Sequence, residues 1–309
     1  MIGSAAAFAP ATVANLGVGF DVLGLAVERL GDEARVRIER RGSGSATAEV
    51  ERIEGDDGVG ELPATGVNNT AAAAARAVLD DVGVRAHAAI ELHKGMPIGS
   101  GLGSSAASAV AAAFATNRAL GSPLRRAQLL NACIEGERLA SGRHADNVAP
   151  ALLGGLVLVR RTDPVDVIRL PLPAGLWLAV VRPRTQVLTR EARAALPKET
   201  PMAHAIQQSA DLASFVSACY SGDLDLLGRS MCDVLAEPTR IGLIDGAEET
   251  LSAMRSAGAL GASISGSGPS LFALCRSKET ARDAGEAAVG VCGGSYFLSR
   301  ADVPGARPA

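Results

Sequence analysis

The feature that most constrains the fold of this chain is a glycine-rich segment at residues 94–106. Its three glycines occupy alternate positions, Gly99, Gly101 and Gly103, after a strand-like stretch and before an alanine-rich one. Alternating glycines let the backbone bend so that successive N–H groups converge, and the start of a helix adds partial positive charge at the same place. The segment therefore predicts a strand, a phosphate-binding loop and a helix, with a simple glycine turn capped by serines as the alternative.

Length and composition narrow the possibilities further. With 309 residues the chain exceeds one typical domain of roughly 100–200 residues, so we expect two domains that share a cleft. Hydrophobic residues make up 48% of the chain but aromatic residues only 3%, which indicates a core of Ala, Val, Leu and Ile with helices packed closely on a sheet. Neither GxxxxGK[ST] nor GxGxxG occurs, so a Walker loop and a dinucleotide-binding fold are not expected.

Charge and cysteine content argue against several classes of protein. Lys and Arg number 30 against 33 Asp and Glu, a formal net charge of −3, so nucleic acid is not an expected partner. The five cysteines form no CxxC pair, which is typical of reduced thiols in a cytosolic protein. No apolar segment reaches the roughly 20 residues of a membrane span, and no secretory signal is evident. We therefore expect a soluble, cytoplasmic protein without membrane contact.

Periodicity along the chain predicts strands and helices that do not alternate regularly, which favours an α+β fold. The expected strands are residues 34–39, 86–92, 155–160 and 176–181, with a hairpin of 262–264 and 271–275 around the loop 265–270. The expected helices are residues 69–80, capped by Asn68 or Asn69, and 104–120, 123–137, 205–220 and 246–257. The charged segment 161–164 is the expected crossing between the domains, and the tail 304–309 is expected to be disordered.

Three motifs together resemble those of the GHMP kinases, the superfamily of galacto-, homoserine, mevalonate and phosphomevalonate kinases. The glycine-rich segment is similar to the Pro-x-x-x-Gly-Leu-x-Ser-Ser-Ala signature, residues 261–270 to the C-terminal glycine motif, and residues 9–21 to the N-terminal motif. The resemblance spans nearly the whole chain. It implies an N-terminal domain like domain 2 of ribosomal protein S5 (1–162), a C-terminal ferredoxin-like domain (163–309) and an active site in the cleft between them.

The resemblance also implies that the protein uses ATP and Mg²⁺. Ser105 and Glu137 are expected to hold the magnesium, with Glu135 as an alternative register for the carboxylate. The residues expected to bind ATP are the loop 97–107, two candidates for adenosine contacts and two glycines of the C-terminal motif: Pro97, Ile98, Gly99, Ser100, Gly101, Leu102, Gly103, Ser104, Ser105, Ala106, Ala107, Asn68, Lys94, Gly266 and Gly268. Asn68 and Lys94 could equally be a helix cap and a surface lysine.

Residues 144–150 are similar to the His-x-Asp-Asn-Val-Ala-Pro pattern of homoserine kinases. Related kinases place a catalytic Asp in this segment, whereas the resemblance puts Asn147 there, with the adjacent Asp146 as the alternative register. An amide is not a useful base, so we expect direct in-line transfer that depends on positioning and electrostatics, with Asn147, Arg193 and Glu137 as the catalytic residues. We expect His144 to make a hydrogen bond rather than to act as a base.

The substrate implied by this pattern is L-homoserine, phosphorylated on its side-chain hydroxyl in threonine biosynthesis. An amino acid needs a cationic clamp for its carboxylate, and arginine supplies the bidentate fork that fits one. The residues expected to bind the substrate are Asn15, Asp21, Glu137, His144, Asn147, Thr189, Arg193 and Arg240. A homodimer is also expected. The alternatives are a mevalonate- or shikimate-type kinase, which would lack the two clamp arginines, and a nucleotide-binding regulator without catalysis.

Overall fold

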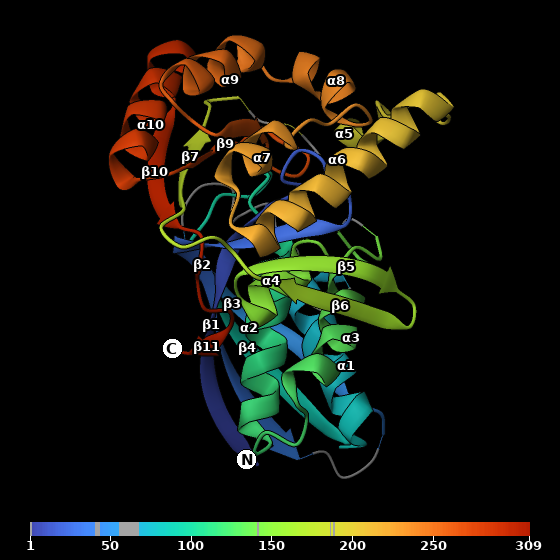
Figure 1. Ribbon diagram of the computed structural model, residues 1–309. Coiled ribbons are helices and arrows are strands. Elements are labelled where there is room, and N and C mark those ends of the chain that lie inside the picture. The colour runs from blue at the N-terminus through green and yellow to red at the C-terminus, as the bar shows by residue number, and fades with distance from the viewer. Residues whose placement is uncertain (1, 41–43, 56–67, 141, 186, 188) are drawn as a thin grey trace.

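The protein is described by a computed structural model that covers residues 2–40, 44–55, 68–140, 142–185, 187 and 189–309. It has two lobes, each with its own sheet and its own covering helices (Figure 1). The first lobe contains strands from both ends of the chain, because the C-terminal segment returns to pair with the first strand. Both termini therefore belong to the first lobe.

The sheet of the first lobe has, within the described residues, seven strands in the order β11-β1-β2-β4-β3, with β5 paired to β2 and β6 paired to β5. All neighbouring strands run antiparallel except β3 and β4. The strands are β1 (Gly3–Ala14), β2 (Leu23–Arg40), β3 (Thr47–Gly55), β4 (Ala86–Lys94), β5 (Leu156–Thr162), β6 (Val165–Leu170) and β11 (Arg307–Pro308).

Alanine-rich helices pack closely on this sheet and on one another. The helices are α1 (Thr70–Val82), α2 (Ser104–Ala119), α3 (Arg126–Glu137) and α4 (Val148–Leu153). Helix α2 packs on β1 and β2, and α1 and α3 pack against α2. At Gly136 an added Cβ would lie 2.9 Å from the Cβ atoms of both Ala74 and Ala109, so the three helices meet where only small residues fit. The expected core of small aliphatic residues is confirmed.

The second lobe has an antiparallel sheet in the order β10-β7-β9-β8, formed by β7 (Trp177–Arg182), β8 (Gly261–Ile264), β9 (Leu271–Cys275) and β10 (Ser295–Arg300). Counted from β7 the order is 4-1-3-2, the arrangement of a ferredoxin-like domain. Helices α9 (Ala247–Ser256) and α10 (Lys278–Cys292) pack on this sheet. The expected α+β fold with a ferredoxin-like second half is confirmed.

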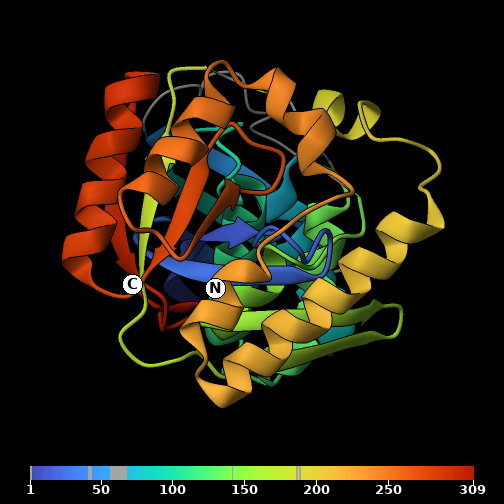
Figure 2. The ribbon, with the colours of Figure 1, turned by 45° about the horizontal axis from the view of Figure 1, so that its top comes forward.

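The chain between β7 and β8 is largely helical. Its helices are α5 (Thr189–Ala194), α6 (Met202–Ser221), α7 (Leu224–Arg229), α8 (Glu237–Arg240) and the 3₁₀ helix Ile241–Leu243, followed by α9. Helix α6 is the longest of them, and its first turns project from the body of the molecule (Figures 1 and 2). Met202 and Ile206 in these turns are 75% and 62% exposed.

Most of the expected helices and strands are confirmed to within a few residues, but the strand expected at 34–39 is only the last part of β2, which begins at Leu23. Asn69 is the cap of α1, because its side chain accepts hydrogen bonds from the N–H groups of Ala71 and Ala72. Two other expectations were wrong. Residues 161–164 are the end of β5 and the turn of the β5–β6 hairpin, and the chain leaves the first sheet only after Leu170. Charged turn residues look the same in a hairpin and in a linker.

The second error concerns the tail. Residues 307–308 form β11 against β1, Ala306 is fully buried, and the N–H of Ala306 donates to the carbonyl of Ala151 at 2.8 Å. Order in this tail comes from backbone pairing with distant residues, which its short Pro-, Gly- and Ala-rich composition does not reveal.

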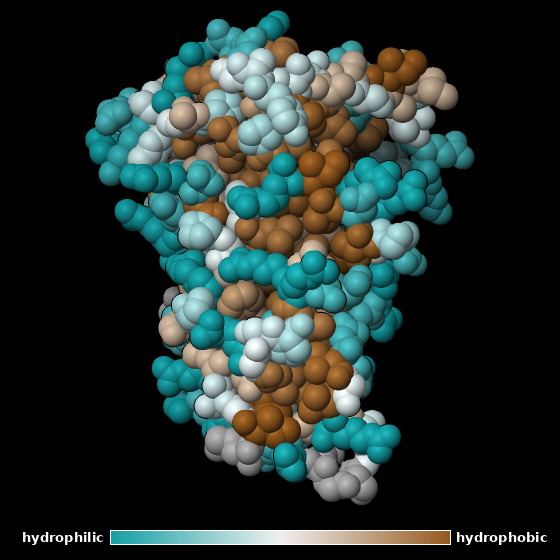
Figure 3. All heavy atoms as spheres, turned by 60° about the horizontal axis from the view of Figure 1, so that its bottom comes forward, coloured by the Kyte–Doolittle hydropathy of each residue, from teal (hydrophilic) through white to brown (hydrophobic). Residues whose placement is uncertain are grey.

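One face of the molecule carries a band of apolar side chains along its middle, bordered by polar and charged ones (Figure 3). Across the described ranges, none of the helices combines the length and the apolar character needed to cross a bilayer.

Candidate active site

A cavity of about 330 Å³ is lined by residues of both lobes. The first lobe contributes the β1–β2 turn, the start of α1, the end of β4 and the loop after it, the start of α2, the end of α3 and residues 139, 140, 144, 146 and 147. The second lobe contributes single residues of α5 and α8 and the β8–β9 loop. The predicted site residues that line it are Asn15, Asp21, Asn68, Lys94, Ile98, Gly99, Ser100, Gly101, Gly103, Ser104, Ser105, Glu137, His144, Asn147, Arg193, Arg240 and Gly266.

The other predicted site residues lie outside this lining: Pro97, Leu102, Ala106, Ala107, Thr189 and Gly268. Leu102 and the two alanines are fully buried in the hydrophobic core, because one side of the loop and of α2 faces the sheet. These three residues pack in the core beneath the loop and do not line the cavity. Thr189 begins α5, and its side chain lies outside the described part of the structure.

The glycine loop is held against both lobes at positions that exclude a side chain. Gly101 has a φ of +75°, and a Cβ there would lie 2.6 Å from the carbonyl oxygen of Gly268 and 2.7 Å from that of Ser265. Gly103 has a φ of +70°, and its Cβ would overlap the hydroxyl of Thr12. The Ser265 hydroxyl also donates to the Gly101 carbonyl at 2.7 Å, so the two glycine motifs are in direct contact.

The polar groups of this loop fit an anionic phosphate chain. Ser100 is one of the residues that line the cavity, and its hydroxyl oxygen is buried without a hydrogen-bond partner among the described residues. Helix α2 begins at Ser104 after Gly103, which has no side chain to cap it, so no side-chain hydrogen bond satisfies the first N–H groups of the helix. Such groups, together with the positive end of the helix dipole, favour a phosphate.

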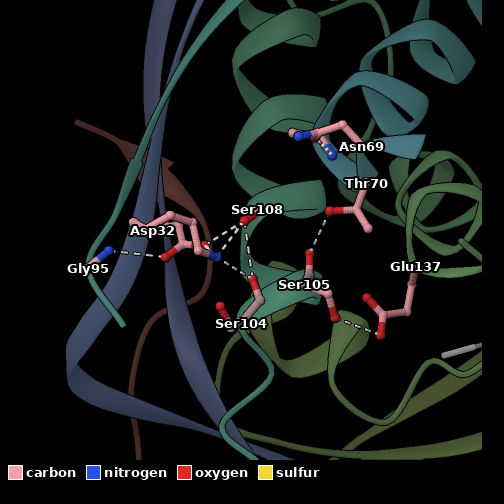
Figure 4. Close-up of polar contacts among 10 residues, drawn as sticks. Asp32, Asn69, Thr70, Gly95, Ser104, Ser105, Ser108 and Glu137 are labelled. Atoms are coloured by element: carbon pink, nitrogen blue, oxygen red, sulfur yellow. Dashed lines mark hydrogen bonds and ion pairs between the residues drawn. The ribbon is translucent and has the colours of Figure 1, made fainter. Parts of the chain in front are cut away.

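Ser105 and Glu137 lie side by side at the start of α2 and the end of α3 (Figure 4). The Ser105 hydroxyl donates to Glu137 Oε1 at 3.0 Å, and Glu137 is buried. A hydroxyl and one carboxylate are hard oxygen ligands, which fit Mg²⁺ when nucleotide phosphates and water complete its shell. Glu135 instead pairs with Arg138 and Arg143 at the surface, so the geometry favours Glu137 for this role.

Asn147 is oriented by a hydrogen bond from a residue that the sequence analysis did not select. The hydroxyl of Thr12, fully buried on β1, donates to Asn147 Oδ1 at 2.7 Å. The amide oxygen is therefore engaged, and the amide nitrogen is the polar atom of Asn147 suited to meet a ligand as a donor.

Arg193, Arg240 and Asp21 form the charged part of the cavity. Arg193 donates two hydrogen bonds to the Asp21 carboxylate, at 2.9 and 3.1 Å, which raises the pKa of Arg193. Arg240 donates to the carbonyl of Gly266 at 2.8 Å, and burial lowers its pKa. The Nε atoms of both arginines are buried without partners among the described residues. Both guanidinium groups lie over the ring of Phe20, at 5.7 and 5.0 Å from its centroid.

Two further groups in the cavity have altered pKa values. Burial raises the pKa of Asp146 to about 7, and the neighbouring charges of Asp21 and Glu137 act in the same direction. Burial lowers the pKa of His144, although Asp21, whose carboxylate lies 3.6 Å from His144 Nδ1, opposes this. Asp146 is thus a carboxylic acid that exchanges its proton near neutral pH directly beside Asn147, a property that the sequence did not show.

Asn15 connects the lobes across the cavity. Its amide nitrogen donates to the carbonyl of Gly266 at 3.1 Å, and its amide oxygen accepts from the N–H of Asp21 at 3.1 Å. One asparagine therefore positions both the second glycine motif and the segment that carries Asp21.

Lys94 is buried and hydrogen-bonded within the protein, whereas Asn68 is exposed. The Lys94 ammonium pairs with Asp32 and donates to the Ser108 hydroxyl at 2.8 Å and to the Ser104 carbonyl at 3.0 Å. Asn68 is exposed and precedes the cap residue of α1. Nucleotide contacts of both residues stay predictions, and Lys94 is buried rather than a surface lysine.

Comparison with known proteins agrees with this geometry. Residues 69–155 match the family model of the GHMP kinases N terminal domain, and residues 215–292 match that of the GHMP kinases C terminal. A homoserine kinase of Chlorobium phaeobacteroides (strain BS1) is 42% identical over 287 residues, which are 91% of this chain and 89% of that protein. The chain belongs to the homoserine kinase family of the GHMP kinases.

Relatives of this GHMP kinase extend to plants and to solved structures. The homoserine kinase of Arabidopsis thaliana is 43% identical over a stretch that covers 90% of this chain and 76% of the Arabidopsis protein. The crystal structure of homoserine kinase from Cytophaga hutchinsonii superposes with a TM-score of 0.92 at 43% identity, over 99% of this chain and 97% of that one. The mevalonate kinase of L. major, at 19% identity and a TM-score of 0.68, shares the fold.

As a GHMP kinase the protein is an ATP-dependent enzyme, and several of its site residues were missed by the sequence analysis. Thr12 and Phe20 lie within the N-terminal motif 9–21, so membership of that motif was the available signal. Asp32 had none, because it meets Lys94 only through the register of β2 and β4.

Proposed function

We propose that this kinase transfers the terminal phosphoryl group of ATP to the side-chain hydroxyl of L-homoserine, giving O-phospho-L-homoserine and ADP in threonine biosynthesis. The observation that carries the proposal is one cavity that holds a phosphate-type loop together with two buried arginine edges and the carboxylate of Asp21. The high identity to proteins named homoserine kinase, over most of the chain, supports the same substrate.

The charged residues of the cavity match a zwitterion. The carboxylate of homoserine would bind to Arg193 and Arg240, whose Nε atoms are unpaired among the described residues, and arginine is suited to bidentate carboxylate contacts. As Arg193 turns to the substrate, Asp21 becomes available to the substrate ammonium. Phe20 supports both guanidinium groups through cation–π contacts. Mevalonate and shikimate have no ammonium group to take the place of Arg193 on Asp21.

The other groups bind and orient the nucleotide. The backbone N–H groups at the start of α2 and the Ser100 hydroxyl would hold the phosphates. Ser105 and Glu137 would hold Mg²⁺, which when bound supplies neutralising charge to the phosphates. Binding of ATP follows from the family, whereas the magnesium ligands are part of this proposal.

We infer direct in-line transfer without a dedicated base. Asn147, with its oxygen engaged by Thr12, would donate from its amide nitrogen and orient the substrate hydroxyl. A loose phosphoryl-transfer transition state needs little deprotonation of the nucleophile at the outset, so positioning and electrostatic stabilisation are sufficient. Arg193 and Glu137 act in the same step by fixing the substrate and the metal.

A coupled ADP-release assay tests this function. Homoserine, mevalonate, shikimate and galactose are compared at saturating ATP and Mg²⁺, with 3-amino-1-propanol as a homoserine analogue that lacks the carboxylate. We expect homoserine to be preferred by a factor on the order of 10² or more, because a compound that leaves buried polar groups of the site unpaired is rejected strongly. Mevalonate and shikimate offer no ammonium to Asp21, 3-amino-1-propanol offers no carboxylate to the arginines, and galactose offers neither. Comparable kcat/KM for mevalonate, shikimate or the decarboxylated analogue would overturn the assignment. A homodimer and a cytoplasmic location stay predictions.

A further inference from the structure

A charged pair is enclosed in the first lobe, beneath the glycine loop. Asp32 on β2 and Lys94 at the end of β4 lie directly opposite each other in the antiparallel register, with side chains 0% and 3% exposed. Removing two charges from water costs several kcal/mol per ion, and well-packed apolar residues often stabilise a fold as well as a buried pair does. Stability alone is therefore a weak reason for this pair.

The hydrogen bonds of Asp32 and Lys94 show which parts of the chain this ion pair contacts. Asp32 Oδ1 accepts from the N–H of Gly95 at 3.2 Å, and Gly95 is the first residue after β4. The Lys94 ammonium donates to the carbonyl of Ser104 at 3.0 Å, and Ser104 is the first residue of α2. One ion pair thus contacts both ends of the loop between β4 and α2 (Figure 4).

Ser108 joins the same group from one turn further along α2. Its hydroxyl donates to Asp32 Oδ2 at 2.6 Å and lies 2.8 Å from the Lys94 ammonium. Asp32 and Ser108 were not among the predicted site residues, and Ser108 alone of the two lines the cavity.

We propose that Asp32, Lys94 and Ser108 are positioning residues that fix both ends of the phosphate loop and so keep its N–H groups arranged for the nucleotide before it binds. Preorganised groups lose less freedom on binding and therefore give higher affinity. The inference rests on the proposed function only in that the loop binds ATP. It predicts a defect specific to the nucleotide, whereas a purely structural role would affect both substrates together.

The main test is the double variant Asp32→Val with Lys94→Met, which removes both charges and their hydrogen bonds to the loop. We expect it to melt within a few degrees of the parent, since apolar replacement of a buried pair is often neutral. Its KM for ATP should rise about tenfold or more, which corresponds to about 1.4 kcal/mol of lost binding, while its KM for homoserine changes less than about twofold. The ATP-induced rise in melting temperature should shrink accordingly.

Two single variants, each of which removes one buried hydroxyl from α2, distinguish an effect on the position of the loop from the general effect of losing a buried hydroxyl. Ser108→Ala should raise the KM for ATP in the same direction by a smaller factor. Thr116→Val removes another buried hydroxyl of α2, one that donates to the carbonyl of Ala112 at 2.8 Å, far from the loop, and should leave the KM for ATP unchanged. If the double variant does not fold, the KM for ATP of Ser108→Ala still tests whether this group positions the loop.

Parental KM for ATP in the double variant or in Ser108→Ala would overturn the inference. So would equal increases in KM for both substrates that follow the loss of stability, because those indicate a structural role alone. A parent protein without any ATP-induced change in melting temperature would refute ATP binding itself, and that result is distinguishable because it is measured before any variant is made.

Discussion

Replacing Gly101 by alanine should separate the two glycine motifs where they touch. The φ of +75° costs an L-residue about 1–2 kcal/mol. The added Cβ would lie 2.6 Å from the Gly268 carbonyl oxygen and 2.7 Å from that of Ser265, so the β8–β9 loop must move away by several tenths of an ångström. That movement strains the Ser265 hydroxyl bond to the Gly101 carbonyl, which contributes about 0.5–1.5 kcal/mol.

The expected loss for Gly101→Ala is therefore about 1.5–3.5 kcal/mol, or roughly 2–5 °C in melting temperature for a chain of this length. Thermal unfolding followed by circular dichroism, with and without ATP and Mg²⁺, measures it. We also expect the KM for ATP to rise at least about tenfold, since the loop proposed to bind the phosphates is displaced.

Two other glycines serve as controls. Gly121 has a φ of +83° and no heavy atom within 4 Å of an added Cβ, so Gly121→Ala carries only the conformational cost. Gly99 has a φ of +67° and its nearest neighbour is 3.8 Å away, so Gly99→Ala should melt like Gly121→Ala. If Gly101→Ala melts within about 1 °C of Gly121→Ala and binds ATP like it, the contact between the motifs does not exist in solution and the reasoning is refuted.

Three further predictions concern the charged residues and Asn147. Arg193→Ala and Arg240→Ala should each lower kcat/KM for homoserine by roughly thirtyfold or more, because losing one partner of a buried charged pair costs about 2–5 kcal/mol. The KM for ATP should stay nearly unchanged. If both variants use homoserine as well as the parent does, the two arginines do not bind the substrate carboxylate. Asn147→Ala should lower kcat by about 10²-fold with a smaller effect on homoserine binding, as steady-state kinetics will show, and an effect on KM alone would exclude a positioning role in the transition state. Because burial raises the pKa of Asp146 to about 7, the folded protein keeps this proton above the pH at which the unfolded chain loses it, so stability falls as pH rises from about 4 to 7. Asp146→Asn should therefore gain more melting temperature over the parent at pH 8 than at pH 5, and an equal difference at both pH values would show that Asp146 titrates normally.

Much of the site could be predicted because its parts are contiguous. Gly99, Gly101 and Gly103 are informative as a run, and Asn69 caps its helix in the way a local sequence signal allows. The position of Asn147 followed from its own motif. Where the prediction failed, as for the tail that forms β11, the missing information was the identity of a distant partner.

The sequence by itself determined the types of the elements, the phosphate loop and the set of chemical groups in the site, because glycine runs, helix caps and hydrophobic periodicity are properties of neighbouring residues. Only the tertiary structure decided which groups meet. Arg193 pairs with Asp21 across 172 positions of the chain, and Asp32 meets Lys94 through a strand register. The pKa of Asp146 likewise depends on burial and on charges that the fold brings near, and no local pattern contains that information.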